Sequence, residues 1–148
     1  MRIVLDPGQG GRDPSSVQEA AANLRVAVST AVALRLATSD LVDVAITRRD
    51  GAKVSYDEGR AMMDGATVVV RIEHRADVPL VIVGNKATPE ALDVATRLGG
   101  GRRPRVDSGR DLLRENPALV LYSPGCKAAS ATLVSALAGF VAASLVPR

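Results

Sequence analysis

Apolar and polar positions along this chain fall into blocks of two kinds. Short, unbroken runs of β-favouring residues predict buried strands, at residues 3–5, 43–47, 67–72, 80–83 and 118–122. Between them, apolar residues recur every three or four positions and predict helices, over residues 18–37, 55–64, 89–98, 108–115 and 128–144. This alternation indicates an α/β fold, a three-layer α/β/α sandwich with a mostly parallel sheet.

Capping residues and loops support these boundaries. Ser55 followed by Glu58 has the spacing of a capping box, and Thr88 followed by proline has that of a helix start. Residues 12–17 are predicted to form a loop. Residues 99–105 (GGGRRPR) are predicted to form a flexible basic loop, either a solvated connector or a patch for phosphate or carboxylate polymers.

Composition limits the kinds of core and partner. Apolar residues make up 47% of the chain and aromatics only 2%, so the core must be aliphatic. The net charge of +3 favours anionic surroundings such as a cell wall, a membrane surface or nucleic acid. Nucleic acid is not expected, because Tyr56, Tyr122 and Phe140 are too scattered to stack bases. The single Cys126 excludes an internal disulfide and a cysteine-rich zinc site.

The 148 residues suit one domain, over residues 1–144. The last four residues, 145–148 (LVPR), look like the remnant of a thrombin-cleavable tag. We expect no signal peptide or membrane span, because no unbroken apolar run reaches about 18 residues. A targeting or anchoring segment would then belong to a longer protein.

The first strand stops abruptly at residues 6–11 (DPGQGG), which cannot continue it. Ligands of open α/β sheets bind at the carboxyl ends of strands, so Gln9 is expected at the binding edge. This stretch resembles the opening motif of the type 3 N-acetylmuramoyl-L-alanine amidases, zinc enzymes that cleave the amide joining the sugar of peptidoglycan to its stem peptide. The family reads Asp-Pro-Gly-His-Gly-Gly, and Gln9 stands in place of that zinc-binding histidine.

The resemblance extends along the chain. Glu19, four residues before Asn23-Leu24, matches a metal-binding glutamate of the family, and Thr47-Arg48 matches the end of its second strand. Residues 65–76 (GATVVVRIEHRA) are similar to the family's third strand, but Glu73 takes the place of a second zinc-binding histidine.

Residues 117–122 (PALVLY) are similar to the family's last strand, but Tyr122 replaces the glutamate that serves as general base. A phenol with a pKa near 10 stays protonated at neutral pH and cannot act as that base. His74 is not expected to replace the lost ligand, because neighbouring residues of a strand point to opposite faces unless a bulge intervenes. An ordinary hydrogen-bonded histidine is expected there.

The resemblance and these replacements together imply a pseudoenzyme without zinc or catalytic residues. We expect an extracytoplasmic domain, on the periplasmic or cell-wall side, that binds peptidoglycan or regulates a cell-wall hydrolase, a membrane protein or a cell-wall and division complex. The binding-cleft candidates are Gln9, Glu19, Arg71, Glu73, Arg75 and Tyr122.

Two alternatives remain open. An active metal-dependent hydrolase would use a rebuilt site with Glu19 and Glu73, with or without His74, around a hard cation or a differently arranged zinc ion. Against this, the two glutamates could simply be neutralised by Arg71, Arg75 or Arg48. The second alternative is an interaction domain of a membrane-anchored complex, in which the cleft is filled and another face binds.

Overall fold

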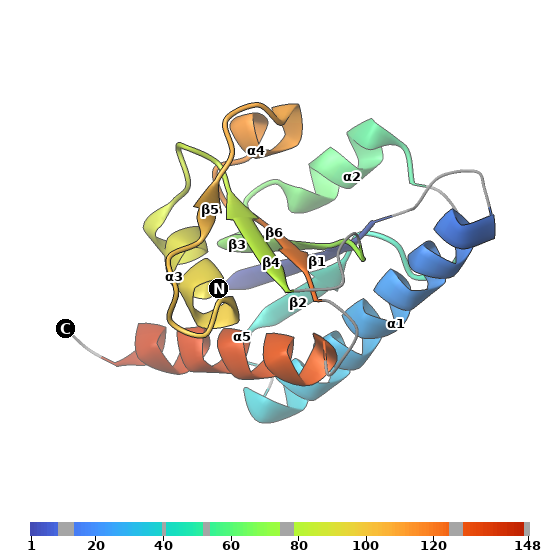
Figure 1. The fold of residues 1–148 in the computed structure, drawn as a ribbon. Helices are drawn as coiled ribbons and strands as arrows, with labels where there is room; N and C mark the ends of the chain where they lie inside the picture. Colours follow the sequence, from blue (N-terminus) through green and yellow to red (C-terminus); the bar gives the residue numbers. More distant parts are fainter. Residues whose placement is uncertain (9–13, 40, 52–53, 75–78, 125–128, 147–148) are drawn as a thin grey trace.

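The computed structural model describes the whole chain except residues 9–13, 40, 52–53, 75–78, 125–128 and 147–148. Figure 1 shows the strands and helices in chain order. They are β1 (Arg2–Pro7), α1 (Pro14–Ala37), β2 (Asp43–Ile46), α2 (Tyr56–Met63), β3 (Val68–Ile72), β4 (Leu80–Val83), α3 (Pro89–Leu98), β5 (Arg105–Val106), α4 (Asp111–Glu115), β6 (Leu119–Ser123) and α5 (Ala129–Leu145).

The strands form one sheet in the order β2-β1-β3-β6-β4-β5. All neighbouring pairs are parallel except β4 and β6, which run antiparallel. The predicted mostly parallel α/β fold is therefore confirmed. In the register, Asp6 lies opposite Arg71, and Ile72 lies opposite Tyr122. The carboxyl ends of β1, β3 and β6 consequently meet at one edge.

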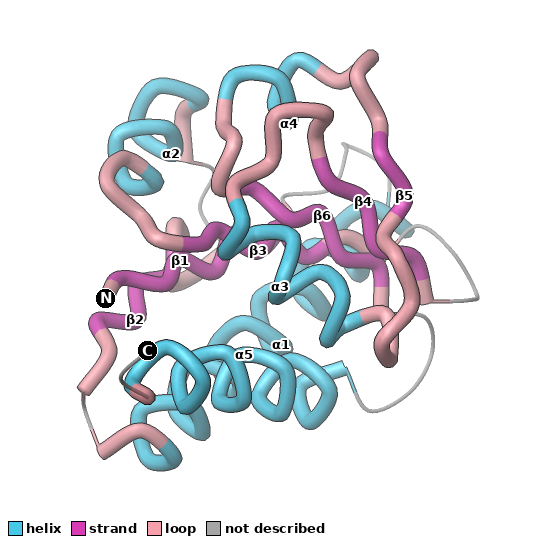
Figure 2. The backbone as a smooth tube through the Cα atoms, turned by 90° about the vertical axis from the view of Figure 1, so that its left-hand side faces the viewer, coloured by secondary structure: helices cyan, strands magenta, loops and turns pink. Residues whose placement is uncertain are grey.

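Helices cover both faces of this sheet unequally (Figure 2). On one face α1, α3 and α5 pack over a large aliphatic core that includes Leu5, Val70 and Leu137. On the other face lies a small core, made of Val4, Met63, Val69, Ile82, Leu113, Leu119 and Leu121. Because α2 and α4 are short, they leave part of this second face uncovered.

Capping residues and apolar runs in the sequence correctly predicted the bounds of several helices and strands. The bounds of β4 and α3 agree with the prediction, and the Ser55–Glu58 capping box and the Thr88 cap are both present. The predicted loop at residues 12–17 was wrong in part, because α1 already begins at Pro14. Proline suits the first helical turn, where its missing N–H has no partner to lose.

The basic loop at residues 99–105 was also predicted incompletely. Its last residue begins β5, which pairs with Ile82 and Val83 of β4. A strand of two residues is too short to show a period in the sequence, and it forms here because β4 offers it an edge. The helix expected from residue 108 begins later, at Asp111, and α5 extends through Leu145.

One expectation about α1 needs correction. Residues Val17–Ala37 are long and apolar enough to cross a membrane by length and composition, with a mean hydropathy of 1.3. An average over a window tolerates isolated charges such as Arg25, which interrupt an unbroken apolar run. In this fold one side of α1 packs against β1 and β2 and buries Ala27, Ala31 and Leu34, while 28% of the apolar span as a whole is buried. Length and composition alone are weak evidence for a membrane span, because mostly buried core helices and signal sequences pass the same test.

Candidate functional site

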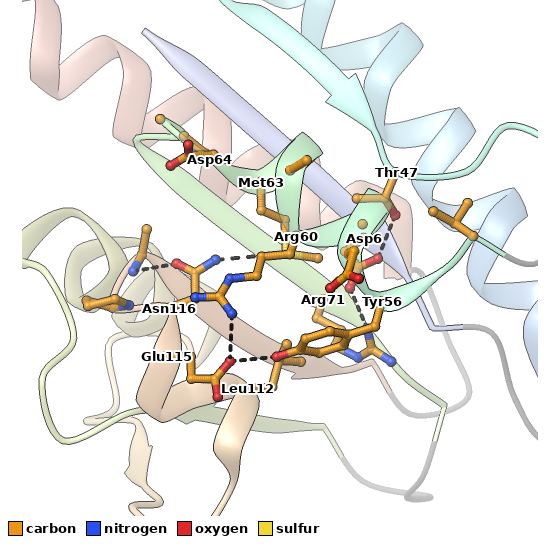
Figure 3. Close-up of a pocket in the computed structure, with 18 of the residues that line it drawn as sticks. Asp6, Thr47, Tyr56, Arg60, Met63, Asp64, Arg71, Leu112, Glu115 and Asn116 are labelled. Carbon is orange, nitrogen blue, oxygen red and sulfur yellow. Dashed lines mark hydrogen bonds and ion pairs between the residues drawn. The ribbon is translucent and has the colours of Figure 1, made fainter.

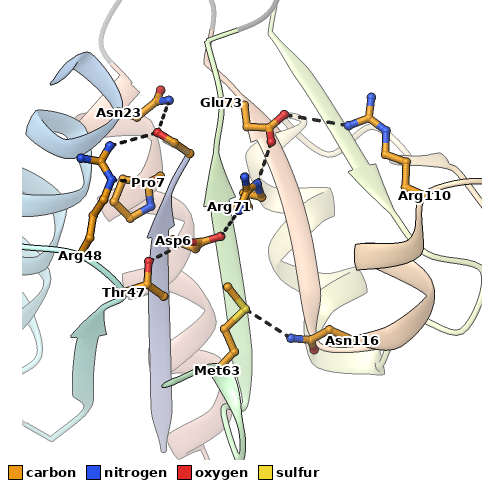
Figure 4. A network of polar contacts seen from close by, with 11 residues as sticks. Asp6, Pro7, Asn23, Thr47, Arg48, Met63, Arg71, Glu73, Arg110 and Asn116 are labelled. Carbon is orange, nitrogen blue, oxygen red and sulfur yellow. Dashed lines mark hydrogen bonds and ion pairs between the residues drawn. The ribbon is translucent and has the colours of Figure 1, made fainter. Parts of the chain in front are cut away.

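A chain of charged side chains crosses the carboxyl ends of β1 and β3 (Figure 4). The Oγ1 of Thr47 donates to Oδ1 of Asp6 at 2.6 Å. The guanidinium of Arg71 bridges two carboxylates, with Nη1 2.5 Å from Oδ2 of Asp6 and Nε 2.7 Å from Oε1 of Glu73. The strand register produces this bridge, because Asp6 and Arg71 are partners on neighbouring strands and Glu73 follows two residues later on the same face.

Both carboxylates of this bridge are buried. The side chains of Asp6 and Glu73 are 8% and 6% exposed, and that of Arg71 is 24% exposed. Burial alone would lower the pKa of Arg71, but the negative charges of Asp6 and Glu73 outweigh it and raise that pKa. On the outer side, Nη1 of Arg110 lies 4.0 Å from Oε2 of Glu73. Glu73 therefore forms ion pairs with arginines. Neutralisation by Arg71 was one of the alternatives that the sequence left open for it.

A second group of polar side chains braces the end of β1. The buried guanidinium of Arg48 donates to the backbone carbonyls of Pro7, Gly8 and Ala20, at 3.3, 3.0 and 2.7 Å. The Nδ2 of Asn23 donates to the same Gly8 carbonyl at 3.1 Å. A Cβ on Gly8 would lie only 3.0 Å from the Ile72 carbonyl oxygen, a tight contact that favours glycine at this close approach. The matched residues Asn23 and Arg48 thus support the backbone.

His74 lies on the α1 side of the sheet. Its Nδ1 is 2.5 Å from Oδ1 of Asn23, whereas Glu73 points toward Arg71. The prediction that the two neighbours face opposite ways is confirmed. Burial lowers the pKa of His74, and the negative charge of Glu19 partly offsets this. Glu19 is consequently a neighbour of His74 and is half-buried on α1.

Tyr122 belongs to the large core, where 2% of its surface is exposed. Burial raises the pKa of its phenol, partly offset by a side-chain hydrogen bond with Thr132 on α5. The alternation along β6 places Tyr122 on the face opposite to Leu121 of the small core. Tyr122 and the Arg71–Glu73 pair therefore lie on different faces of the sheet.

The uncovered part of the second face forms a cavity of about 860 Å³ between α2, α4 and the sheet (Figure 3). Asp6 and Arg71 lie at its wall, and Met63 and Leu112 supply apolar surface. Near its mouth, Tyr56 donates to Oε2 of Glu115 at 2.6 Å, and Nη1 of Arg60 lies 3.4 Å from the same oxygen. The cavity thus combines apolar walls with charged groups of both signs.

The candidate cleft residues are not brought together as one group. Glu73 and Arg71 are paired, Glu19 lies by His74 on the other face, and Tyr122 is in the core. Gln9 and Arg75 lie outside the described residues. Among the described residues, no three histidine, cysteine, aspartate or glutamate side chains are grouped to hold a metal ion.

Sequence reasoning missed the roles of Asp6, Thr47 and Arg110, and the cavity residues Tyr56, Arg60 and Glu115. One signal was available for Asp6. Arg71 interrupts the run of valines in β3, and a charged residue inside a buried strand requires an opposite charge. The cavity left no such signal, because it depends on how α2 and α4 pack.

No protein-family model matches the chain, and a search of curated protein sequences found no match. Solved structures do match it. The catalytic domain of CwlV, an N-acetylmuramoyl-L-alanine amidase from Bacillus (Paenibacillus) polymyxa var. colistinus, has a TM-score of 0.70 at 16% identity, with 97% of each chain covered. An N-acetylmuramoyl-L-alanine amidase from Clostridium difficile 630 has a TM-score of 0.71 at 23% identity, covering 97% of this chain and 96% of that chain.

A third match is the CwlD amidase from Clostridioides difficile in complex with the GerS lipoprotein. Its TM-score is 0.65 at 16% identity, and 97% of this chain and 98% of that chain are covered. At such low identities the likeness establishes the fold. The chain therefore has the α/β fold of N-acetylmuramoyl-L-alanine amidases over nearly its whole length.

Proposed function

We propose that this protein is a catalytically inactive amidase-fold domain that binds peptidoglycan on the extracytoplasmic side of the membrane, without zinc. The observation that carries this proposal is the Arg71 bridge, which engages Glu73 at the position of a family metal ligand. A carboxylate that is already bonded to a guanidinium is a poor ligand for zinc.

The position of Tyr122 also supports a loss of hydrolysis. A general base must reach the attacking water, with heavy atoms roughly 3 Å apart. Tyr122 packs in the large core, and burial raises the pKa of its phenol still further above neutrality. Both observations support the proposal that the position of the family's glutamate supplies no base here.

The cavity beside Arg71 is the proposed binding place for the stem peptide of peptidoglycan. Stem peptides carry carboxylates, amide groups and short aliphatic side chains. The cavity offers Arg60, carboxylates such as Asp57, and the apolar side chains of Met63 and Leu112 for these groups. Its volume of about 860 Å³ falls within the range of small-ligand sites, roughly 300–1,000 Å³.

Cosedimentation with purified peptidoglycan sacculi at raised salt tests this proposal, because salt screens nonspecific attraction to a basic protein. We expect the protein to pellet with the sacculi and to release no stem peptides, measured by mass spectrometry of the supernatant. Protein that stays in the supernatant would contradict wall binding and would favour a role in regulating a wall hydrolase or membrane partner. Released stem peptides would contradict inactivity.

A matched pair of variants locates the binding. Ala61 is exposed on α2 and lines the cavity, whereas Ala143 is exposed on α5, which packs on the opposite face. Ala61→Trp fills the cavity without removing a polar contact, so we expect it to reduce pelleting severalfold. Ala143→Trp should pellet like the native protein. Equal pelleting of the two variants would place the binding surface elsewhere.

A further inference from the structure

Two carboxylates face each other across one guanidinium at the ends of β1 and β3. Asp6 and Glu73 are both more than nine-tenths buried, and Arg71 contacts both of them (Figure 4). Their two negative charges are balanced by Arg71 and, at 4.0 Å from Glu73, by Arg110. Buried carboxylates are stable only when a cation or strong hydrogen-bond donors compensate them.

We propose that the guanidinium of Arg71 is the resident cation of this site. It joins Asp6 to Glu73 in the way that a divalent metal ion joins two carboxylates, and it excludes such ions from the native protein. The inference rests on the proposed function in one respect, that the native protein binds no divalent metal here.

The geometry favours this role over an ordinary surface ion pair. Arg71 uses two different nitrogens, Nη1 for Asp6 and Nε for Glu73, so each carboxylate has its own hydrogen bond. The oxygens of two buried carboxylates are also the ligands that hard cations such as Ca²⁺ and Mn²⁺ prefer. Removing the arginine while keeping both carboxylates therefore leaves a space between Asp6 and Glu73 in which a cation could bind.

The test compares the native protein with Arg71→Ser in the presence of Mn²⁺, Ca²⁺ or Zn²⁺, each alone. Melting temperatures and isothermal titration calorimetry report binding. We expect the native protein to bind none of the three ions and to keep its melting temperature in their presence. Arg71→Ser should melt at a lower temperature than the native protein at pH 7, and at least one ion at about 100 times its Kd should raise that temperature by roughly 5 °C or more.

Two control variants separate this effect from a general response to lost charge. Arg60→Ser removes an arginine from the exposed pair with Glu115, and we expect it to gain no metal response. The double variant Arg71→Ser/Asp6→Asn keeps only one carboxylate of the site and should lose the metal response of the single variant.

The outcomes distinguish the two proposals. Suppose that neither the native protein nor Arg71→Ser binds a divalent ion, even if Arg71→Ser is unfolded and stays unfolded when metal is added. The role of Arg71 as resident cation is then wrong, and the proposed function stands. If the native protein binds one ion per chain, that role is wrong as well. Release of stem peptides by the native protein would contradict the proposed function independently.

Discussion

Arg48 is a buried cation whose hydrogen bonds go to backbone carbonyls of β1, α1 and the turn after β2. Replacing it with alanine leaves the buried carbonyl of Pro7 and the partly buried carbonyl of Ala20 without this donor. Hydrogen bonds to a charged group contribute roughly 1.5–3 kcal/mol each, so we expect Arg48→Ala to lose about 3 kcal/mol or more of unfolding free energy. Urea denaturation measures this loss.

The neighbouring Arg49 provides the control, because its side chain is exposed. Arg49→Ala should change the unfolding free energy by less than about 0.5 kcal/mol, as most surface substitutions do. Similar losses for the two variants would show that Arg48 does not brace the end of β1.

His74 makes stability depend on pH. Burial lowers its pKa in the folded protein, so the unfolded chain takes up the proton first as pH falls. The native protein should therefore lose stability as pH drops through about 6.5, whereas His74→Gln lacks this contribution. Urea midpoints of both proteins between pH 8 and 5 check this, and parallel pH profiles would contradict it.

The residue-scale predictions succeeded where they needed only the local backbone. Strand alternation was enough to place Glu73 and His74 on opposite faces. The partnership of Asp6 with Arg71 spans 65 residues and depends on the register between β1 and β3, which one sequence does not contain. The bracing role of Arg48 was not predicted for the same reason, because its acceptors lie at the end of β1 and on α1.

Among the elements, α4 depends on a glycine of the segment that follows β4. A Cβ on Gly84 would lie 2.6 Å from the backbone carbonyl oxygen of Leu113 in α4. Backbone atoms cannot move aside as a flexible side chain can, so Gly84→Ala must displace α4. We expect a loss of about 1–3 kcal/mol in unfolding free energy, measured by urea denaturation.

Gly51 is the matched position for this test, because a Cβ there meets nothing within 4 Å. Gly51→Ala should be neutral or slightly stabilising, since alanine restricts the unfolded chain. If Gly84→Ala were equally neutral, the contact between this segment and α4 would not hold α4 in place.

Element boundaries were predictable where capping and composition agreed, as at α3. The sequence did not indicate that β4 pairs antiparallel with β6, because an apolar run of four residues has no direction. It also did not indicate that α2 and α4 would leave a cavity. Both features depend on tertiary packing.

The two faces of the molecule serve different purposes. The large core takes most of the aliphatic residues and buries Tyr122 beneath α5, whereas the small core lies beside the Arg71 bridge and the cavity. The residues that match the amidase family at Asn23 and Arg48 contact backbone, so they preserve the fold. The positions matched to a zinc ligand and to the general base, Glu73 and Tyr122, contact Arg71 and the large core instead.

On the proposed function, putting the family's glutamate at position 122 should not by itself give activity. Tyr122→Glu places a carboxylate in the large core, where burial should raise its pKa. We expect a loss of about 3–5 kcal/mol at pH 7 and no release of stem peptides from sacculi. Because a buried carboxyl is tolerated when protonated, the deficit relative to the native protein should shrink as pH falls toward 5.

Tyr122→Phe, which loses only the hydrogen bond with Thr132, should lose about 1 kcal/mol. A Tyr122→Glu variant as stable as Tyr122→Phe at pH 7, or one that releases stem peptides, would show instead that this position opens onto a functional cleft.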